Sequence, residues 1–564
     1  MGYREVYEEW LKNDFFDNPT KEEILSIKNN DEEIRDRFYK SLEFGTAGLR
    51  GKIGVGTNRM NKYIVAKTTQ GLAYTILSRG KEAREKGVVI SYDVRYFSKE
   101  FAEVAASVLA GNGIKVYLSD RIRPTPVLSY AIRYFKAISG IMITASHNPK
   151  EYNGYKAYWK EGSQILDNIA EEIIGNIDKV EKFSSIKTMN LEEAFEIGVV
   201  EYFGEKLDDA YIKDILTLSI EDEKVDKNIS VVYSPLNGTG NKFVSRILKE
   251  RDFNNVYVVK EQELPDSDFE TVGYPNPEDP KAFKYAIDLG RKVKADILIA
   301  TDPDADRIAV EVRDVKGEYV FLNGNKIGAL LINYILSTRS TKNNLPKNGV
   351  IVKSIVTGDL GSKIAEKYDI EMVETLTGFK NIEAKANEYD ITGDKTFIFG
   401  FEESIGFNYG TFVRDKDAVS TAMIIVEMVG YYKNQNKSLL DILEELYNEY
   451  GYYDEQLNSI VLEGLEGQCR IKMIMEEFRE SPIEKIGYKK LVKVEDFLKD
   501  IKNMGKSNVL KFYYDDGSWY ALRPSGTEPK IKTYIYTIGF TKKEVRDNIE
   551  ITASAIKAKF DNIK

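Results

Sequence analysis

Three aspartates occupy alternate positions in the segment Asp302-Pro303-Asp304-Ala305-Asp306-Arg307. The segment follows the apolar run Ile297-Leu298-Ile299-Ala300, which is typical of a buried strand. Clustered carboxylates repel one another unless a cation or solvent offsets their charge. An EF-hand loop is excluded because Arg307 and Arg313 stand at positions 6 and 12, which require glycine and glutamate. A solvated acidic loop is the simpler alternative, but we interpret the segment as a Mg²⁺ site with Arg307 turned toward an anion.

The chain has a single histidine, His147, and a single cysteine, Cys469, among its 564 residues. These counts exclude metal sites built from several histidines or thiolates, such as those of zinc proteases. Any metal must therefore bind oxygen ligands, which favours Mg²⁺, Mn²⁺ or Ca²⁺. A lone cysteine forms no internal disulfide, and we expect a cytoplasmic protein.

Ser146 lies in Thr144-Ala145-Ser146-His147-Asn148-Pro149, directly after an apolar run. Neighbouring side chains of an extended backbone point to opposite faces, so Ser146 and His147 are predicted to make a poor nucleophile–base pair for a hydrolase. A serine beside Mg²⁺ can instead carry a phosphoryl group, whose charge the metal and Arg307 would offset. Lys156 could reach this site as a proton donor, although its spacing alone fits an ordinary surface lysine.

A fourth motif, Arg523-Pro524-Ser525-Gly526-Thr527, combines a guanidinium, two hydroxyls and a glycine. These groups can bind phosphate, and a plain surface turn is an equal alternative. Known nucleotide loops do not match. Gly505-Lys506-Ser507 has Asp500 in place of the first Walker A glycine, and Gly51, Gly54 and Gly56 do not have dinucleotide spacing.

The elements that must position these motifs form a repeat. Three segments contain apolar strands separated by helical stretches, and the last strand of each runs into a polar loop. These loops lie at residues 145–149, 301–307 and 400–404. Such patterns predict parallel sheets covered by helices, with ligands beyond the carboxyl ends of the strands. We therefore expect three similar α/β domains with mixed, mostly parallel sheets, and a smaller C-terminal α+β domain, around one central cleft. The expected boundaries are 1–208, 209–322, 323–450 and 451–564.

The composition is that of a globular protein, with 42% hydrophobic and 30% charged residues. A net charge of −10 argues against nucleic acid as a partner, because phosphate backbones bind surplus Lys and Arg. No apolar run reaches the roughly 18 residues that a membrane span needs. The expected partner is a small molecule, and the expected state is a monomer or homodimer.

Together the four motifs resemble those of the α-D-phosphohexomutase superfamily, in the same order and over almost the whole chain. The loop at Ser146 resembles its phosphoserine loop, and residues 302–307 resemble its metal loop. Gly400-Phe401-Glu402-Glu403-Ser404 resembles its sugar loop, in the version of the phosphoglucomutase group. The segment Phe44-Gly45-Thr46-Ala47-Gly48-Leu49-Arg50-Gly51 is similar to the longer branch, which also contains phosphopentomutases.

The resemblance implies an isomerase that interconverts glucose 1-phosphate and glucose 6-phosphate. It implies a phosphorylated Ser146, a bound glucose 1,6-bisphosphate and Mg²⁺ held by Asp302, Asp304, Asp306 and a phosphoserine oxygen. It places Arg50, His147 and Lys156 around proton transfer. It also implies substrate contacts at Arg50, Arg307, Lys353, Thr377, Gly378, Lys380, Glu402, Ser404, Lys416, Arg523, Ser525, Gly526 and Thr527.

Two near alternatives are a phosphomannomutase or a phosphopentomutase on the same scaffold. A Mg²⁺-dependent phosphatase that passes through a phosphoserine is a more distant alternative. The separate phosphate loop argues against the phosphatase, because a hydrolase has no need to hold a second phosphate. A catalytically silent sugar-phosphate binding protein is the third alternative, which the presence of Ser146 and three aspartates disfavours.

Overall fold

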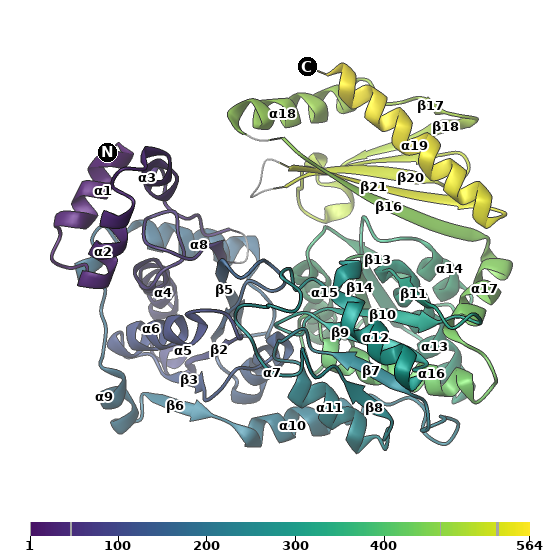
Figure 1. Cartoon of the computed structure of the whole chain (residues 1–564), viewed down its shortest axis with the longest axis horizontal. Coiled ribbons are helices and arrows are strands. Elements are labelled where there is room, and N and C mark those ends of the chain that lie inside the picture. Colours follow the sequence, from purple (N-terminus) through teal and green to yellow (C-terminus); the bar gives the residue numbers. More distant parts are fainter. Residues whose placement is uncertain (1, 46–47, 463, 526–529, 564) are drawn as a thin grey trace.

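The computed structural model describes residues 2–45, 48–462, 464–525 and 530–563 (Figure 1). Three short helices come first: α1 (Tyr3–Lys12), α2 (Asn18–Ser26) and α3 (Asp31–Phe38). Trp10, Phe16 and Phe38 form the centre of their small apolar cluster. This cluster also contains Val55 and Tyr63, so the helices pack onto the first α/β domain.

The first sheet has the order β1-β5-β4-β2-β3-β6. Its strands are β1 (Gly48–Lys52), β2 (Val88–Tyr92), β3 (Val116–Ser119), β4 (Ser139–Ile143), β5 (Tyr152–Trp159) and β6 (Val200–Phe203). The helices of this domain are α4 (Lys62–Leu77), α5 (Lys81–Lys86), α6 (Ser98–Gly111), α7 (Thr125–Phe135), α8 (Asp167–Asp178), η1 (Phe183–Ser185) and α9 (Leu191–Glu196). The next helix, α10 (Glu205–Leu216), spans the expected boundary at residue 208.

The second and third sheets have the orders β11-β10-β9-β7-β8 and β13-β12-β14-β15. The second domain contains β7 (Val231–Ser234), α11 (Asn241–Glu250), β8 (Val256–Val258), η2 (Pro280–Phe283), α12 (Lys284–Val293), β9 (Ile297–Thr301), β10 (Ile308–Arg313) and β11 (Tyr319–Leu322). The third contains α13 (Gly324–Thr341), β12 (Gly349–Ser354), α14 (Leu360–Glu366), β13 (Glu371–Thr375), α15 (Phe379–Thr392), β14 (Thr396–Glu402), β15 (Gly406–Tyr409), α16 (Ala418–Lys433) and α17 (Leu439–Tyr450).

The last sheet is antiparallel, with the order β16-β21-β20-β19-β18-β17. It is built from β16 (Tyr452–Val461), β17 (Lys485–Ile486), β18 (Lys489–Asp496), β19 (Leu510–Tyr514), β20 (Trp519–Pro524) and β21 (Lys530–Gly539). Helices α18 (Gly464–Glu480) and α19 (Lys542–Asn562) lie together over it in Figure 1, and η3 (Phe497–Lys499) and η4 (Ile501–Asn503) follow β18. The predicted fold of three α/β domains and a C-terminal α+β domain is confirmed.

The repeat is visible in the strand pairing of the three α/β domains. In each repeat one central strand (β2, β7 or β12) pairs in parallel with the next two strands along the chain, as in β3-β2-β4, β8-β7-β9 and β13-β12-β14. An antiparallel strand then returns beside the third one, namely β5, β10 or β15. The sequence analysis missed these return strands. In β5 both faces are buried, so polar residues such as Asn153 do not alternate with apolar ones in the way that marks a half-buried strand.

Each predicted loop therefore connects a parallel strand to its antiparallel return strand. The largest apolar cluster contains side chains of α7, β7, β9, α13 and α16, so the first domain packs directly against the second and the third. No helix in the described ranges is both long and apolar enough to cross a bilayer.

Candidate active site

Ser146 lies in the loop between β4 and β5, and its buried hydroxyl donates a hydrogen bond to Asp302 Oδ2 across 2.7 Å. Its Oγ atom is also 3.2 Å from Nδ1 of His147. The expectation that these neighbouring side chains point apart is wrong. Ser146 has a φ of +52°, so the backbone here is left-handed instead of extended, and the two side chains turn toward each other.

Arg95 binds the backbone of this loop through its guanidinium, and the sequence analysis did not identify this residue. Its guanidinium pairs with Asp93, and both side chains are fully buried. Its NH groups donate to the carbonyl oxygens of Ser146, Asn148, Pro149 and Tyr152. Asp93 in turn accepts a hydrogen bond from Thr144 Oγ1 at 2.6 Å. The sequence could have indicated its role, because Asp93 and Arg95 are charged residues that follow a predicted strand, as the other site residues do.

The aspartate loop between β9 and β10 reaches the same place. Asp302 Oδ1 accepts the backbone N–H groups of Asp306 and Arg307, both at 3.1 Å. The carboxylates of Asp302, Asp304 and Asp306 are buried, and one oxygen of each lies within 4.8 Å of the other two. The structure thus brings the predicted metal loop and Ser146 together.

Two lysines compensate part of this charge. Lys156 Nζ, on β5, lies 2.7 Å from Asp304 Oδ2 and 3.2 Å from Asp306 Oδ2, while Lys416 Nζ lies 3.2 Å from Asp306 Oδ2. Burial opposes the charge of Lys156, but the two aspartates outweigh it and raise its pKa. The pKa of Lys416 is raised in the same way by Asp306 and Asp415, against burial. Lys156 is only 9% exposed, so the interpretation as a surface lysine is wrong.

Two carboxylate oxygens of the cluster have no hydrogen-bond donor among the described residues. Asp304 Oδ1 and Asp306 Oδ1 are buried and accept no hydrogen bond from any residue within the described ranges. Buried anionic oxygens without a donor are costly unless a cation binds them. Three clustered carboxylates, two of which keep an oxygen without a hydrogen-bond donor among the described residues, are suited to a hard divalent cation, so the donor set fits Mg²⁺.

Arg50, His147 and Arg307 surround the serine and the carboxylates. Arg50, on β1, donates to Asn148 Oδ1 at 3.0 Å. Burial, followed by the positive charges of Arg307 and Arg50, lowers the pKa of His147 well below its ordinary value, which favours a neutral imidazole. Arg307 Nε lies 3.8 Å from Asp306 Oδ1.

The sugar loop lies beside the aspartate loop, because Arg307 and Gly406 form an isolated antiparallel bridge. Glu402 Oε1 accepts the N–H of Gly378 at 3.0 Å. Burial raises the pKa of Glu402, and neighbouring Glu403 adds to this effect. Thr377 precedes Gly378 and is partly exposed, as is Ser404. A cavity of about 220 Å³ is lined by Ser404 together with residues of the second, third and last domains, including Glu278, Glu403 and Tyr534.

The predicted phosphate loop is described only in part. Arg523 lies near the end of β20, and Ser525 donates its N–H to the carbonyl of Lys530 at 2.7 Å. Gly526 and Thr527 lie outside the described residues. Burial lowers the pKa of Lys532, and the positive charges of Arg523, Lys530 and Arg307 lower it further. Arg523 lies opposite Lys532 in the pairing of β20 with β21, so these two basic residues are neighbours in the last sheet.

Two predicted substrate lysines have other partners. Lys353 Nζ is buried and donates to Asp359 Oδ1 at 2.5 Å and to the carbonyls of Thr357 and Gly358. Lys380 Nζ donates to Asp167 Oδ1 at 2.6 Å, which links the third domain to the first. Their contacts with substrate stay predictions.

The sequence was compared with models of known protein families. Models of phosphoglucomutase/phosphomannomutase alpha/beta/alpha domains I, II and III match residues 41–184, 209–317 and 323–450, and the model of the C-terminal domain matches residues 483–547. The chain belongs to the phosphoglucomutase/phosphomannomutase family. A curated phosphoglucomutase of Staphylococcus epidermidis is 39% identical over 543 residues, which are 94% of this chain and 95% of that protein. A phosphoglucomutase of Staphylococcus aureus is 39% identical over 519 residues, covering 90% and 92% of the two chains.

Solved structures of family members share the fold. A putative phosphomannomutase from Thermus thermophilus matches with a TM-score of 0.69 at 23% identity, over 92% of this chain and 99% of that one. The open form of pp63/parafusin from Paramecium, described as a phosphoglucomutase, matches with a TM-score of 0.69 at 19% identity, over 93% and 96%.

Proposed function

We propose that this family member interconverts glucose 1-phosphate and glucose 6-phosphate through a phosphoryl group carried on Ser146. The observation that carries the proposal is the position of Ser146 Oγ, 2.7 Å from Asp302, which is one of three clustered and buried carboxylates. The staphylococcal relatives, which are named phosphoglucomutases and align over at least 90% of this chain, support glucose as the sugar.

His147 and Lys156 have different roles in proton transfer. When the phosphoryl group leaves Ser146 Oγ and bonds to a free sugar hydroxyl, that hydroxyl loses its proton. His147 is suited to accept the proton, because its pKa is lowered and its ring lies beside Ser146. Lys156, which is protonated between Asp304 and Asp306, gives a proton to Ser146 Oγ as the phosphoryl group leaves and takes it back when Ser146 is phosphorylated again. After the bound glucose 1,6-bisphosphate reorients, its other phosphoryl group returns to Ser146, and His147 gives the proton back to the sugar oxygen.

The metal proposed here is Mg²⁺, held by Asp302, Asp304, Asp306 and a phosphoserine oxygen. Bound there, it offsets the charge of the transferring phosphoryl group. Arg50 and Arg307 are suited to orient that group, because both guanidinium groups border the serine loop.

The remaining residues bind the rest of the substrate in this proposal. Glu402 and Ser404 bind sugar hydroxyls, with Thr377, Gly378 and Lys416 beside them. The phosphate that is not reacting is held by Arg523, Ser525, Gly526 and Thr527. Lys353 and Lys380 are further substrate contacts. The division of the chain at 208, 322 and 450 belongs to the same proposal and assigns one loop to each domain.

A coupled assay tests the proposal with glucose 1-phosphate, mannose 1-phosphate and ribose 1-phosphate, with free phosphate measured in parallel. We expect glucose 6-phosphate as the main product, little free phosphate, and activity that EDTA removes and Mg²⁺ restores. Ser146→Ala is expected to abolish turnover without a change in thermal midpoint. Ser91→Ala is the matched control, because Ser91 is also buried in the first sheet and its hydroxyl has no partner among the described residues. Near-normal turnover by Ser146→Ala would contradict the phosphoserine, and dominant release of free phosphate would indicate a phosphatase.

A further inference from the structure

The two oxygens of the Asp304 carboxylate have different surroundings. Oδ2 accepts hydrogen bonds from the Thr125 hydroxyl and from Lys156 Nζ, both at 2.7 Å. Oδ1 is buried and has no hydrogen-bond donor among the described residues. The donors to Oδ2 therefore decide how the carboxylate is turned and where Oδ1 lies.

Thr125 contacts Asp304 from another domain. It is fully buried and is the first residue of α7 in the first domain, whereas Asp304 lies between β9 and β10 of the second. Its backbone N–H donates to the carbonyl oxygen of Asp304 at 2.8 Å. Thr125 thus binds both the backbone and the side chain of this aspartate.

Lys156 is less suited to set the orientation of Asp304. Its ammonium is shared between Asp304 and Asp306, at 2.7 and 3.2 Å. It also ends a flexible chain, and a compact ammonium imposes little direction on a carboxylate. Thr125 has a short β-branched side chain with few rotamers, and prolines on both sides of it restrict the backbone. Its hydroxyl is therefore the more rigid of the two donors.

The neutral charge of Thr125 matters for a cation site. Lys156 cancels part of the negative charge that attracts a cation, whereas a hydroxyl orients the carboxylate and leaves its charge in place. Partners that orient metal ligands contribute strongly to metal binding, and their loss typically weakens it about ten- to a hundredfold.

We propose that Thr125 is a positioning residue of the metal site, whose hydroxyl fixes Asp304 so that Oδ1 is available to a divalent cation. This inference rests on the Mg²⁺ site of the proposed function. It adds that the site is complete only while the start of α7 is docked on the aspartate loop, so the first domain takes part in metal binding through a residue that acts on Asp304.

The test measures the binding of Mg²⁺ alone to the metal-free, full-length protein by isothermal titration calorimetry. Thr125→Val keeps the branched shape of the side chain and removes the hydroxyl. We expect this variant to bind Mg²⁺ about ten- to a hundredfold more weakly than the wild type. Thr125→Ser keeps the hydroxyl and is expected to restore most of the affinity. Samples are matched for phosphoserine content, because a phosphoserine oxygen is a further proposed ligand.

A second measurement separates positioning from a structural role. The Mg²⁺ concentration that gives half-maximal turnover should rise for Thr125→Val, while turnover at saturating Mg²⁺ stays close to that of the wild type. A fixed Mg²⁺ concentration should raise the thermal midpoint of the variant less, since weaker binding stabilises the folded state less. A lower midpoint of the metal-free variant together with an unchanged Mg²⁺ affinity would indicate a structural role and overturn the proposal.

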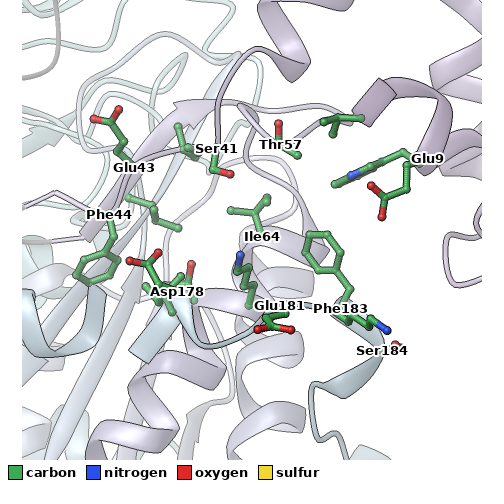
Figure 2. A pocket seen from close by; sticks show the side chains of 18 of the residues that line it. Glu9, Ser41, Glu43, Phe44, Thr57, Ile64, Asp178, Glu181, Phe183 and Ser184 are labelled. Carbon is green, nitrogen blue, oxygen red and sulfur yellow. The ribbon is translucent and has the colours of Figure 1, made fainter. Parts of the chain in front are cut away.

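Thr57→Val is the control. The Thr57 hydroxyl also donates at 2.7 Å, to the carbonyl oxygen of Lys40. Thr57 lines a cavity of about 740 Å³ between the N-terminal helices and the first domain, and none of the residues assigned above to chemistry or substrate binding lines this cavity (Figure 2). We therefore expect Thr57→Val to bind Mg²⁺ as tightly as the wild type.

Two further outcomes separate this inference from the proposed function. Equal Mg²⁺ affinities of Thr125→Val and the wild type would overturn the role of Thr125 and leave the metal site in place. A wild-type protein that binds no Mg²⁺ would overturn the metal site itself and this inference with it.

Discussion

Arg523 is the charged side chain at the end of β20 that we assign to the phosphate that is not reacting. It lies beside Lys532 and Tyr534, on strands that face the sugar loop, as the influence of Glu403 on the pKa values of both neighbours indicates. A guanidinium presents a planar fork of donors that matches phosphate oxygens, which no smaller side chain reproduces.

Arg523→Ala is therefore expected to lower kcat/KM by roughly ten- to a hundredfold, the equivalent of about 1.5–3 kcal/mol for a charged hydrogen bond. The phosphoserine content, measured by mass spectrometry, should stay unchanged, because Ser146 lies in another domain. Arg546→Ala, which removes an exposed arginine of α19, is the control. A wild-type kcat/KM for Arg523→Ala would place this residue outside the substrate site.

Glu311 is a buried carboxyl of β10 that takes no part in the proposed chemistry. It is 4% exposed, and its Oε2 atom has no hydrogen-bond partner among the described residues. Burial raises its pKa from 4.5 to about 7. Between these values the folded protein binds more protons than the unfolded chain, so stability falls as the pH rises from about 4.5 to about 7.

Glu311→Gln removes this charge, and we expect the variant to melt at a higher temperature than the wild type at pH 8. The difference should shrink toward pH 5, and the change in relative stability over this range amounts to at most about 3 kcal/mol. Thermal midpoints at several pH values measure it. Glu318→Gln, at an exposed position of the same hairpin, should show no such trend. A pH-independent difference for Glu311→Gln would contradict a raised pKa.

At the scale of the elements, the connection between β4 and β5 owes its shape to one guanidinium. Four carbonyl groups of this connection turn toward Arg95, which also stacks over the Phe269 ring of the second domain at 5.2 Å. A lysine could keep the charge, but its compact ammonium cannot bond to all four carbonyls in the same geometry. Arg95 is thus a positioning residue for Ser146.

Arg95→Lys should reduce kcat by about ten- to a hundredfold, with KM little changed, because a displaced loop places Ser146 badly for transfer. Steady-state kinetics measure the two parameters separately. Arg79→Lys is a matched control, since Arg79 also donates several hydrogen bonds, to Glu172 and Thr75, but lies just after the end of α4. A purely structural role would be indicated if Arg95→Lys lowered the thermal midpoint while kcat stayed at the wild-type value.

The sequence identified the third strand of each repeat and the polar loop that follows it, because continuous apolar runs that end in charged residues are local features. Two details of the loops depend on tertiary contacts and escaped it. The left-handed backbone at Ser146 is stabilised by hydrogen bonds with Arg95 and Thr144. Arg95 is distant from Ser146 in the sequence, and the residue type of Thr144 does not reveal its role. The burial of Lys156 depends on the aspartate loop, about 150 residues away along the chain.

At the scale of the molecule, the last sheet is attached to the third domain by a few specific contacts. Trp519 Nε1 donates to Asp359 Oδ2 at 2.7 Å, and the Leu360 N–H donates to the Tyr536 hydroxyl at 3.0 Å. Lys511 Nζ adds a hydrogen bond to the Ile355 carbonyl at 2.8 Å. These contacts fix β19, β20 and β21 relative to residues 355–360 of the third domain.

Trp519→Phe keeps the ring and removes its bond to a charged group, so it should lower the free energy of separating the last sheet by about 1.5–3 kcal/mol. Hydrogen exchange of the backbone amides in α14 and β20 measures this change and should become faster. Trp159→Phe is the control, because the indole N–H of Trp159 has no acceptor in the described ranges. Unchanged exchange in Trp519→Phe would show that the bond to Asp359 does not hold the junction.

The largest apolar cluster runs without interruption from α7 through β7 and β9 to α13 and α16, and it reaches Trp519 in the last sheet. A fragment restricted to one sheet and its own helices would leave part of this surface in contact with water. Large exposed apolar patches promote aggregation. We therefore expect that a single domain of the repeat cannot be expressed or exchanged alone. A chimera of this chain and a relative would need to take each interdomain helix and the surface that it packs against from the same protein.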